Sequence, residues 1–320
     1  MRIGIIKLSA LGDIVVAMSF LYAIKQKYQC RIDWFVDERF EGVLQNSQLI
    51  EKLYSIPLKR LVSQKDFKGL WQIKKKLNSL EPYDILFDMQ GLIKSSILGK
   101  MIPAKIYQGF AWDSIKEPWA SLLYSRKIQI PYQENILKRN AMLLGVEVNQ
   151  PQKAFGFLPQ SLQKILPLIA SERKKVLLVF EASRKEKMYP IAQWIEVCKI
   201  LSEKVEFLIL SHSYLLEAQH LAEEGKAMLL PQLSLDEVKA LVGRVDGVVG
   251  GDTGIVHLAW AMQKPSVTLY GNTPLKRFEL CGEKNFSLSK NPNAQYQKND
   301  FSIAKITPQE ICQKIVEMLE

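Results

Sequence analysis

The feature that most constrains this chain is an alternation of short apolar runs with helical periodicity, and it occurs twice. In the first half, helical patterns such as 67–80 and 92–101 separate runs with the composition of buried strands. These runs are 2–8, 32–36, 52–56, 85–88 and 105–110. Strands that alternate with helices pair in parallel, with helices on both faces of the sheet. The first half therefore predicts a doubly wound α/β domain.

A second alternating set begins at Lys175. Strands are predicted at 176–180, 205–210, 227–230 and 265–270, and helices over 190–201, through 221, from 234 and from 307. The last helix opens with a capping box of Thr307 and Glu310 and with Pro308 at its first position. Residues 149–153 and 156–159 are rich in turn formers, so we expect a linker there. We predict two domains, 1–155 and 160–320, the second ending in a helix, with a cleft between them.

The stretch 245–259 of the second set carries the strongest functional signal. An apolar run stops at Gly250-Gly251, meets Asp252 and Thr253, and continues with helical spacing from Gly254. Glycines let a backbone approach a ligand closely, and the free N–H groups at the helix start favour a phosphate. Two interpretations of Asp252 are open: it caps the helix, or it holds a sugar hydroxyl beside the phosphates.

The first turn of the chain is the second candidate site. A strand at 2–8 leads through residues 9–13 into a helix, and in a doubly wound sheet ligands bind beyond such strand ends. Gly12 is the only glycine of the turn and no P-loop lysine follows, so neither a dinucleotide fingerprint nor a P-loop is present. Asp13 is either a carboxylate at the rim of a cleft or the N-cap of the helix.

The net charge of +10 lies almost entirely in the first half of the chain. Residues 1–160 carry 23 lysines and arginines against 14 acidic residues, whereas residues 161–320 carry 20 against 19. The densest patch comprises Lys59, Arg60, Lys65, Lys68, Lys74, Lys75 and Lys76. We expect an anionic partner for the first half, such as nucleic acid, phosphorylated lipid or a membrane surface. A solvated helix face is the alternative for Lys74–Lys76.

Other features point to an ordinary cytoplasmic protein. The first residues lead straight into a strand instead of a signal peptide, and no run of about 18 apolar residues is available to span a bilayer. The four cysteines, Cys30, Cys198, Cys281 and Cys312, lack metal-ligand spacing and predict buried or incidental thiols.

Five segments together give the chain a resemblance to glycosyltransferase family 9. They are Leu11-Gly12-Asp13, Asp88 to Ser95, Lys116 to Ser121, Arg184 to Pro190, and Asp252-Thr253-Gly254 with His257. These segments occur in the same order as in the family and with nearly the same spacing, so the resemblance extends over both halves of the chain. The last segment marks the family strongly, whereas Gln90 to Ser95 and Glu117-Pro118 favour its lipopolysaccharide heptosyltransferases of type I over types II and III.

The resemblance implies a GT-B architecture, in which two Rossmann-like domains face a cleft. It implies inverting transfer of L-glycero-D-manno-heptose from ADP-heptose to the first Kdo of Kdo2-lipid A, during synthesis of the lipopolysaccharide inner core. The second domain would hold the ADP-sugar and the first the anionic acceptor, which suits the basic first half. The protein would then work in the cytoplasm of a Gram-negative bacterium, peripheral to the inner membrane, without a cofactor and without nucleic acid as a partner.

The resemblance also assigns roles to residues. Asp13 matches the proposed base, which removes the proton of the attacking hydroxyl. The donor-binding set is Ser183, Lys187, Glu217, Leu233, Asp252, Thr253, Gly254 and His257. Lys187 and Ser183 would meet the diphosphate, Asp252 the heptose, and Glu217 the ribose hydroxyls. As contacts of the lipid A phosphates we predict Lys59, Arg60, Lys94 and Arg126.

Two positions depart from the family pattern. Ala182 stands where a threonine is usual and cannot donate a hydrogen bond, and Leu233 stands where a methionine often flanks the adenine. The chain has no Asp-x-Asp pair, the spacing with which glycosyltransferases of the other major fold hold Mg²⁺ or Mn²⁺. We therefore expect no metal site, with Lys187 and the helix N-terminus meeting the diphosphate charge instead.

Alternatives remain open for residues and for function. Lys187 can equally be a surface charge, and His257 a packed core histidine, a partner that orients Asp252, or a ligand contact. A type II or III enzyme would add heptose to an already heptosylated core. A nicotinamide dehydrogenase would need a glycine-rich first turn. A basic nucleic-acid-binding protein would leave Asp13, Lys187 and Asp252 without a purpose.

Overall fold

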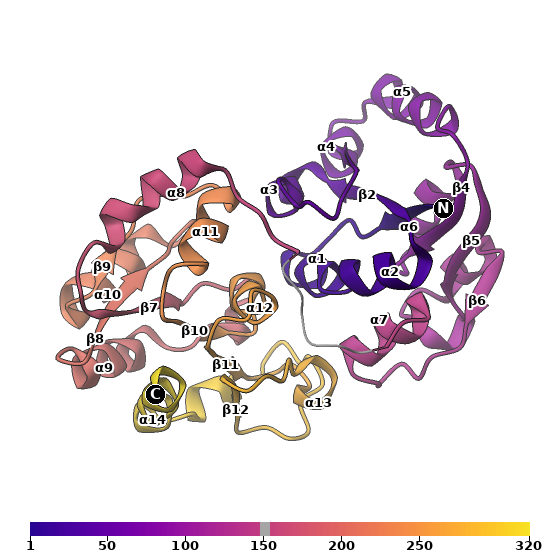
Figure 1. Cartoon of the computed structure of the whole chain (residues 1–320). Helices are drawn as coiled ribbons and strands as arrows, with labels where there is room; N and C mark the ends of the chain where they lie inside the picture. Colours follow the sequence, from indigo (N-terminus) through magenta and orange to yellow (C-terminus); the bar gives the residue numbers. More distant parts are fainter. Residues whose placement is uncertain (148–153) are drawn as a thin grey trace. The chain divides into compact units, whose positions relative to one another are not determined.

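The computed structural model describes residues 1–147 and 154–320, which fall into two compact units, Met1–Gly156 and Phe157–Glu320 (Figure 1). Each unit is built around its own six-stranded sheet, and neighbouring strands in both sheets run parallel. Residues 149–153 of the predicted linker lie outside the described residues. The fold class is thus confirmed as α/β with two doubly wound parallel sheets.

The sheet of the first unit has the order β3-β2-β1-β4-β5-β6, which is the Rossmann order. Its strands are β1 (Arg2–Ile6), β2 (Arg31–Asp37), β3 (Lys52–Ile56), β4 (Tyr83–Asp88), β5 (Ala104–Phe110) and β6 (Arg126–Ile128). Its helices are α1 (Leu11–Met18), α2 (Leu21–Tyr28), α3 (Glu41–Leu44), α4 (Leu58–Ser63), α5 (Phe67–Asn78), α6 (Ile93–Lys100) and α7 (Ile136–Leu144), with short 3-10 turns η1 (Glu38–Phe40), η2 (Trp112–Ser114) and η3 (Pro118–Leu123).

Two consecutive side chains of β4, which point to opposite faces, show how helices cover both faces of this sheet. Leu86 packs in a cluster with Leu77 of α5 and Leu98 of α6. The next residue, Phe87, faces the other way and contacts the ring of Tyr28 on α2, whose hydroxyl donates to a carbonyl at the end of α7. A strand that is apolar on both faces must be covered on both.

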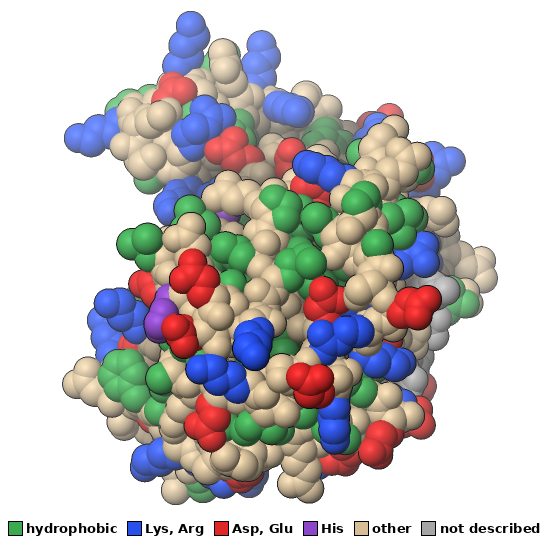
Figure 2. Space-filling view, turned by 90° about the vertical axis from the view of Figure 1, so that its left-hand side faces the viewer, with side chains coloured by type: hydrophobic (Ala, Val, Ile, Leu, Met, Phe, Trp, Pro, Cys, Tyr) green, Lys and Arg blue, Asp and Glu red, His purple; other side chains and the backbone are tan. Residues whose placement is uncertain are grey.

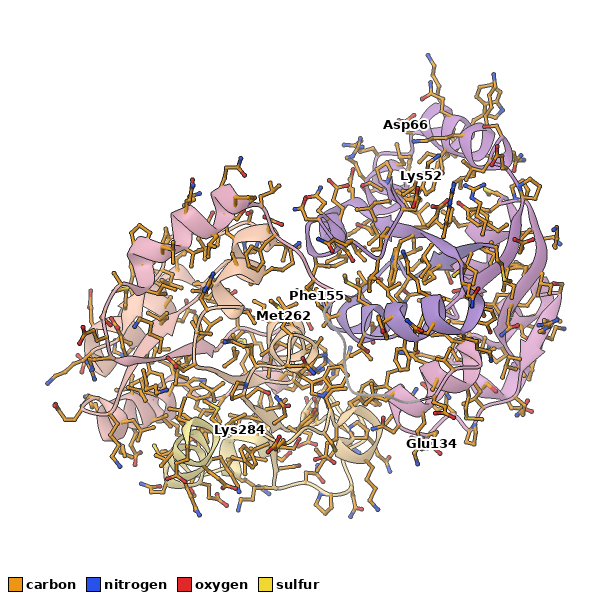
Figure 3. All side chains as sticks on the ribbon, viewed as in Figure 1. Lys52, Asp66, Glu134, Phe155, Met262 and Lys284 are labelled. Atoms are coloured by element: carbon orange, nitrogen blue, oxygen red, sulfur yellow. The ribbon has the colours of Figure 1, made fainter. Side chains whose placement is uncertain are left out.

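The second unit repeats the same topology with the order β9-β8-β7-β10-β11-β12. Its strands are β7 (Lys174–Val179), β8 (Val205–Ile209), β9 (Met228–Leu229), β10 (Gly247–Gly251), β11 (Ser266–Tyr270) and β12 (Asn285–Ser289). Its helices are α8 (Pro159–Ile165), α9 (Ile191–Leu201), α10 (Leu215–Gly225), α11 (Leu235–Val242), α12 (Gly254–Ala261), α13 (Leu275–Phe278) and α14 (Pro308–Leu319), with 3-10 turns η4 (Leu166–Ile169), η5 (Lys185–Lys187) and η6 (Ser302–Lys305). Helices α9, α10 and α14 share one core cluster around the buried Trp194, and side chains fill the space between sheet and helices in both units (Figure 3).

The predicted strands and helices are confirmed, but several elements were missed, among them β6, β12 and α8. Strand β6 has three residues, two of them exposed, and β12 is half-buried throughout; both lie at sheet edges, where the apolar signal of a buried strand is weak. Helix α8 begins at Pro159, where the sequence predicted the end of a linker. Proline at the first helical position marks a start as readily as it marks a turn.

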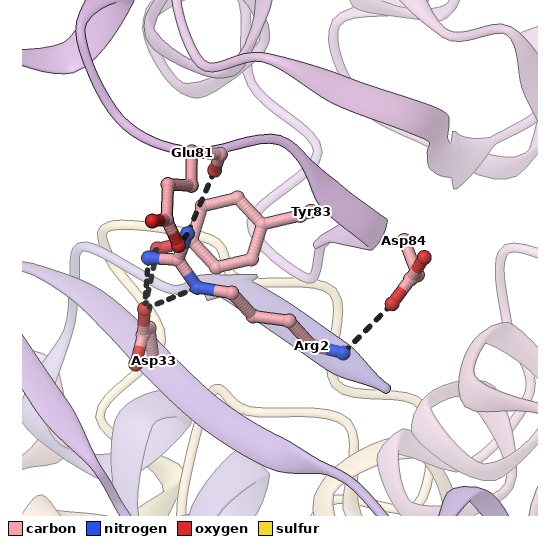
Figure 4. Close-up of polar contacts among 5 residues, drawn as sticks. All are labelled: Arg2, Asp33, Glu81, Tyr83 and Asp84. Carbon is pink, nitrogen blue, oxygen red and sulfur yellow. Dashed lines mark hydrogen bonds and ion pairs between the residues drawn. The ribbon is translucent and has the colours of Figure 1, made fainter.

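A polar network joins three strands of the first sheet at their amino ends (Figure 4). The guanidinium of Arg2 on β1 lies 2.8 Å from the buried Asp33 of β2, and the hydroxyl of Tyr83 on β4 donates to the same carboxylate at 2.6 Å. The backbone N–H of Arg2 also donates to Asp84 at 2.9 Å. The network joins the amino ends of these strands, whereas Rossmann-like sheets bind ligands at the carboxyl ends.

The surface of the second unit matches its near-neutral composition. On the face that Figure 2 presents, acidic and basic side chains are interspersed over most of this unit. No helix among the described residues is both long and apolar enough to cross a membrane.

Candidate active site

The predicted donor-binding residues all follow the carboxyl ends of four neighbouring strands in the second sheet. Ser183 and Lys187 follow β7, Glu217 follows β8, Leu233 follows β9, and the Asp252 segment follows β10. Parallel strands end at one edge, so these segments gather there. The strand order reverses between β7 and β10, which is where such sheets bind ligands.

At this reversal point three of the predicted residues are in direct contact. The Lys187 Nζ lies 2.5 Å from Oδ2 of Asp252, and Nε2 of His257 lies 2.9 Å from Oδ1 of the same carboxylate. Asp252 is buried and Lys187 is mostly buried. Lys187 is therefore not a surface charge, and His257 orients Asp252, which was one of its three interpretations.

Lys187 and His257 also keep Asp252 ionised. Burial alone would raise the pKa of this carboxyl, but the hydrogen bond from His257 and the charge of Lys187 outweigh it and hold the pKa well below its usual range. The site therefore presents a fixed ammonium group at the sheet edge.

The two glycines at the end of β10 serve this contact. A Cβ at Gly251 would lie 2.5 Å from the carbonyl oxygen of Lys187, and one at Gly250 would lie 2.4 Å from that of Val179. The sequence predicted that these glycines admit a ligand. In the structure they admit protein backbone, which lets η5 approach β10 closely enough for Lys187 to reach Asp252.

Helix α12 begins beside this cluster without a side-chain cap. Its N-cap is Thr253, whose side chain makes no capping hydrogen bond, and the Oγ1 atom of Thr253 is buried without a partner. The interpretation of Asp252 as the N-cap is wrong, because its carboxylate is engaged by Lys187 and His257. The first N–H groups of α12, from Gly254 onward, can therefore serve an anion.

The remaining donor candidates are less buried. Ser183 and Glu217 are exposed, the latter in the first turn of α10, and Leu233 is half-buried before α11. Glu181, two residues after the end of β7, was not among the predicted site residues. Its Oε1 accepts hydrogen bonds from the Ser211 hydroxyl and from three successive backbone N–H groups, so it fixes the loop that leads to Glu217. The sequence signal that could have identified Glu181 is a carboxylate one or two residues after a predicted strand.

Asp13 lies at the corresponding reversal point of the first sheet, after β1. It occupies the first turn of α1, half-buried, and its Oδ2 accepts from the backbone N–H of Ala10 at 3.3 Å. The helix is capped at Ala10, so the interpretation of Asp13 as the N-cap is wrong. The other face of the carboxylate is available for chemistry.

The turn that carries Asp13 is held by Gln90. The Oε1 of Gln90 accepts from the N–H groups of Leu8 and Ser9 at 3.1 and 3.0 Å, while the Lys7 ammonium donates to the Met89 carbonyl at 3.0 Å. From the sequence alone, Gln90 was only one of the residues that carry the family resemblance. The side chain links β4 to the first turn, a contact across 81 or 82 residues of sequence.

The buried carboxylate of Asp88 organises the Gln90 segment. Its Oδ1 accepts from the N–H groups of Gln90 and Gly91, and its Oδ2 accepts from the hydroxyls of Ser95 and Tyr124. Burial raises the pKa of Asp88, and these hydrogen bonds oppose the rise. The Glu117 carboxylate accepts from the N–H of Ile93, so the two segments that favour type I enzymes meet at the start of α6.

A pocket of about 550 Å³ lies in the same unit near the carboxyl ends of β1 and β2. Its lining brings together two of the predicted acceptor contacts, Lys59 and Lys94, and adds Arg39, in the set Leu8, Asp37, Arg39, Leu58, Lys59, Val62, Ser63, Lys94 and Ile97. The structure does not bring Arg60 and Arg126 into this lining. Arg60 pairs with Glu38 at 3.0 Å, and Arg126 lies on β6, the edge strand opposite to β3.

Within residues 1–147 and 154–320, no three His, Cys, Asp or Glu side chains gather in a way that could hold a metal ion. The predicted functional groups at the two reversal points are the carboxylates of Asp13 and Asp252 and the ammonium of Lys187. Such groups suit proton removal and anion binding.

Comparison with known proteins agrees with this arrangement. Residues 70–306 match the model of glycosyltransferase family 9 (heptosyltransferase). Lipopolysaccharide heptosyltransferase 1 of Campylobacter coli is 31% identical over 99% of both chains, and that of Escherichia coli K12 is 27% identical over 85% of this chain and 88% of its own. The structure of E. coli heptosyltransferase WaaC with ADP-2-deoxy-2-fluoro heptose superposes with a TM-score of 0.78, at 25% identity over 99% of both chains. The chain belongs to glycosyltransferase family 9, the heptosyltransferases.

Proposed function

We propose that this enzyme transfers L-glycero-D-manno-heptose from ADP-heptose, with inversion, to the first Kdo of Kdo2-lipid A in lipopolysaccharide inner-core synthesis. The observation that carries the proposal is the Lys187–Asp252–His257 cluster beside the uncapped start of α12. A buried ammonium and free helix N–H groups are what a sugar diphosphate requires. The relatives named lipopolysaccharide heptosyltransferase 1, and the E. coli structure with an ADP-heptose analogue, support this donor.

In the donor site, Lys187 and the start of α12 offset the charge that develops on ADP as it leaves. Asp252 holds the lysine in place and accepts a heptose hydroxyl, while Glu217 accepts the ribose hydroxyls and Leu233 packs on the adenine. Ser183 donates to a phosphate oxygen. The reaction needs no divalent cation in this scheme.

In the first unit, Asp13 removes the proton of the Kdo hydroxyl as its oxygen attacks the anomeric carbon. A single displacement inverts the configuration and needs only this one base, because ADP leaves without protonation. Lys59, Lys94 and Arg39 meet the negative groups of the acceptor in the pocket that Leu8 also lines. The enzyme works from the cytoplasm at the surface of the inner membrane, where such an acceptor resides.

The test is turnover of ADP-heptose with Kdo2-lipid A in excess EDTA, following ADP release and acceptor mass together. Wild type should add one heptose, and Asp13→Asn should lose about 10²–10⁴-fold in kcat while binding ADP normally. Glu51→Gln, an exposed carboxylate of the same unit, is the matched control and should keep full turnover.

Three outcomes would overturn parts of the proposal. Turnover only on a heptosylated acceptor would make the protein a type II or III enzyme. Full activity of Asp13→Asn would remove the base, and loss of wild-type turnover in EDTA, restored by Mg²⁺, would show that a metal carries the diphosphate charge.

A further inference from the structure

Helix α5 carries large apolar side chains on its exposed side, in addition to those that pack it against the first unit. Its inner side chains, including Ile73 and Leu77, pack against the core cluster of the first unit. Phe67 and Trp71 stand on the outer side, one helical turn apart, and are 76% and 60% exposed. On the preceding α4, Val62 is 58% exposed. Large exposed side chains that gather on one surface mark an interaction site.

The charges on this stretch of the sequence are almost all positive. Residues 58–80 contain seven lysines and arginines but one acidic residue, Asp66. The Asp66 carboxylate is already used as the N-cap of α5, where it accepts from the N–H of Gly69 at 2.8 Å. The ammonium of Lys75 lies 5.6 Å from the Trp71 ring centroid, so cation and aromatic ring share the outer surface.

The figures place this surface at the outer limit of the first unit. Helix α5 is the uppermost element of the first unit in Figure 1, and side chains project outward from it beside the labelled Asp66 in Figure 3. A rotation about the vertical axis keeps it at the top of this unit in Figure 2, where basic side chains extend outward.

We propose that the outer face of α4 and α5, formed by Val62, Phe67, Trp71 and the surrounding lysines, docks the enzyme on an anionic lipid bilayer. Aromatic rings between lysines insert at the level of the lipid headgroups, while the ammonium groups pair with the phosphates. This inference rests on the proposed function, since a lipid-anchored acceptor requires an enzyme that meets the membrane. It adds which surface makes that contact.

The position of the acceptor pocket supports a bilayer as the occupant. Lys59, Val62 and Ser63 of α4 belong both to the docking helices and to the pocket lining. A molecule anchored in the bilayer would therefore reach the pocket from the docked surface. A second copy of the chain fits less well, because a two-fold contact through this face would set lysines against lysines.

The experiment is cosedimentation of the full-length enzyme with vesicles that contain neither acceptor nor donor. Wild type should bind vesicles of phosphatidylglycerol and phosphatidylcholine at least about tenfold more tightly than vesicles of phosphatidylcholine alone. The double variant Phe67→Ser/Trp71→Ser should bind the anionic vesicles about tenfold more weakly, and Trp71→Phe should bind nearly as wild type does.

A matched control carries the same chemical change on the second unit. Leu216→Ser/Phe301→Ser removes two side chains that are 79% and 53% exposed and should leave vesicle binding unchanged. All variants should turn over a water-soluble, deacylated acceptor at the wild-type rate, which establishes that they are folded and that the loss is confined to docking.

Three results would overturn the inference: equal binding by wild type and Phe67→Ser/Trp71→Ser, equal loss in the control variant, or a change of oligomeric state in Phe67→Ser/Trp71→Ser alone. The last would make the face a contact between copies. Because the vesicles lack the acceptor, a failure of docking is distinct from a failure of the proposed reaction, which the soluble acceptor reports.

Discussion

At the scale of single residues, the site depends on pairs that are distant in sequence. Lys187 and Asp252 are 65 residues apart, yet their side chains meet because β7 and β10 are adjacent strands. Asp252 contacts both Lys187 and His257 and stays ionised. A buried pair of this kind does not have to stabilise the fold. The pair holds the Lys187 ammonium beside the start of α12.

Gln90 offers a prediction at this scale. Gln90→Leu removes the acceptor for the N–H groups of Leu8 and Ser9, so the turn before Asp13 should loosen. We expect kcat to fall about tenfold, with the KM for ADP-heptose unchanged. Steady-state kinetics for both substrates, with ADP affinity as a check of the donor site, measure this.

Gln90→Glu supplies the control, because it retains an oxygen that can accept both hydrogen bonds and should recover most of kcat. If both variants lose equally in kcat, the charge or the packing at this position matters instead of the acceptor. If neither loses activity, Gln90 does not position the turn.

At the scale of elements, α14 illustrates a helix start that is encoded locally. Thr307 caps the helix by accepting from the N–H of Glu310, and the Glu310 carboxylate accepts from the N–H of Thr307 at 3.0 Å. The Lys290 ammonium lies 2.5 Å from the same carboxylate. The hydrogen bond from Lys290, followed by that from Thr307, lowers the pKa of Glu310 to about 2.

This lowered pKa predicts a pH-dependent contribution to stability. A carboxyl with a depressed folded-state pKa stabilises the protein above its unfolded pKa of about 4.3 and loses that effect as the pH falls toward 2. Glu310→Gln should therefore lower the free energy of unfolding by about 0.5 kcal/mol at pH 7, since solvent screens this exposed pair.

Urea unfolding of wild type and Glu310→Gln at pH 7, 5 and 3 checks the prediction. The difference between the two proteins should be the same at pH 7 and 5 and smaller at pH 3. Glu317→Gln, which removes the partner of Lys314 without touching the cap, is the control and should cost less at pH 7. A difference that grows toward pH 3 would contradict the assignment.

At the scale of the whole molecule, the net positive charge lies almost entirely in one unit. The first half carries a net charge of +9 and the second +1. Charges spread over a surface act at a distance and are screened by salt, whereas a largely buried contact such as that of Lys187 with Asp252 is screened much less.

Salt should therefore affect the two substrates differently. Raising NaCl from about 50 to about 500 mM should increase the KM for the anionic acceptor about tenfold and the KM for ADP-heptose only a few-fold. Initial rates at varied concentrations of each substrate measure both values, and potassium glutamate in place of NaCl controls for specific effects of chloride. An equal rise in both KM values would mean that the charge asymmetry does not serve the acceptor.

The sequence by itself determined the two α/β units, the elements that form their sheets, and the strand ends that carry Asp13, Lys187 and Asp252. Such features follow from local periodicity and from turn and capping residues, which act over a few positions. The edge strands β6 and β12 were not predicted, because neither is apolar enough to give a local sequence signal.

Only the tertiary structure decided what the site residues do. Asp13 and Asp252 were both open to interpretation as N-caps, and neither occupies that position, because the N-caps are Ala10 and Thr253. Asp13 instead accepts from the Ala10 N–H from within the first turn. Gly251 at the end of β10 packs against the backbone of Lys187, and Gln90 accepts hydrogen bonds from a turn more than 80 residues away. These contacts arise where strand order reverses, and which strands become neighbours is a property of the assembled sheet that no local stretch of sequence specifies.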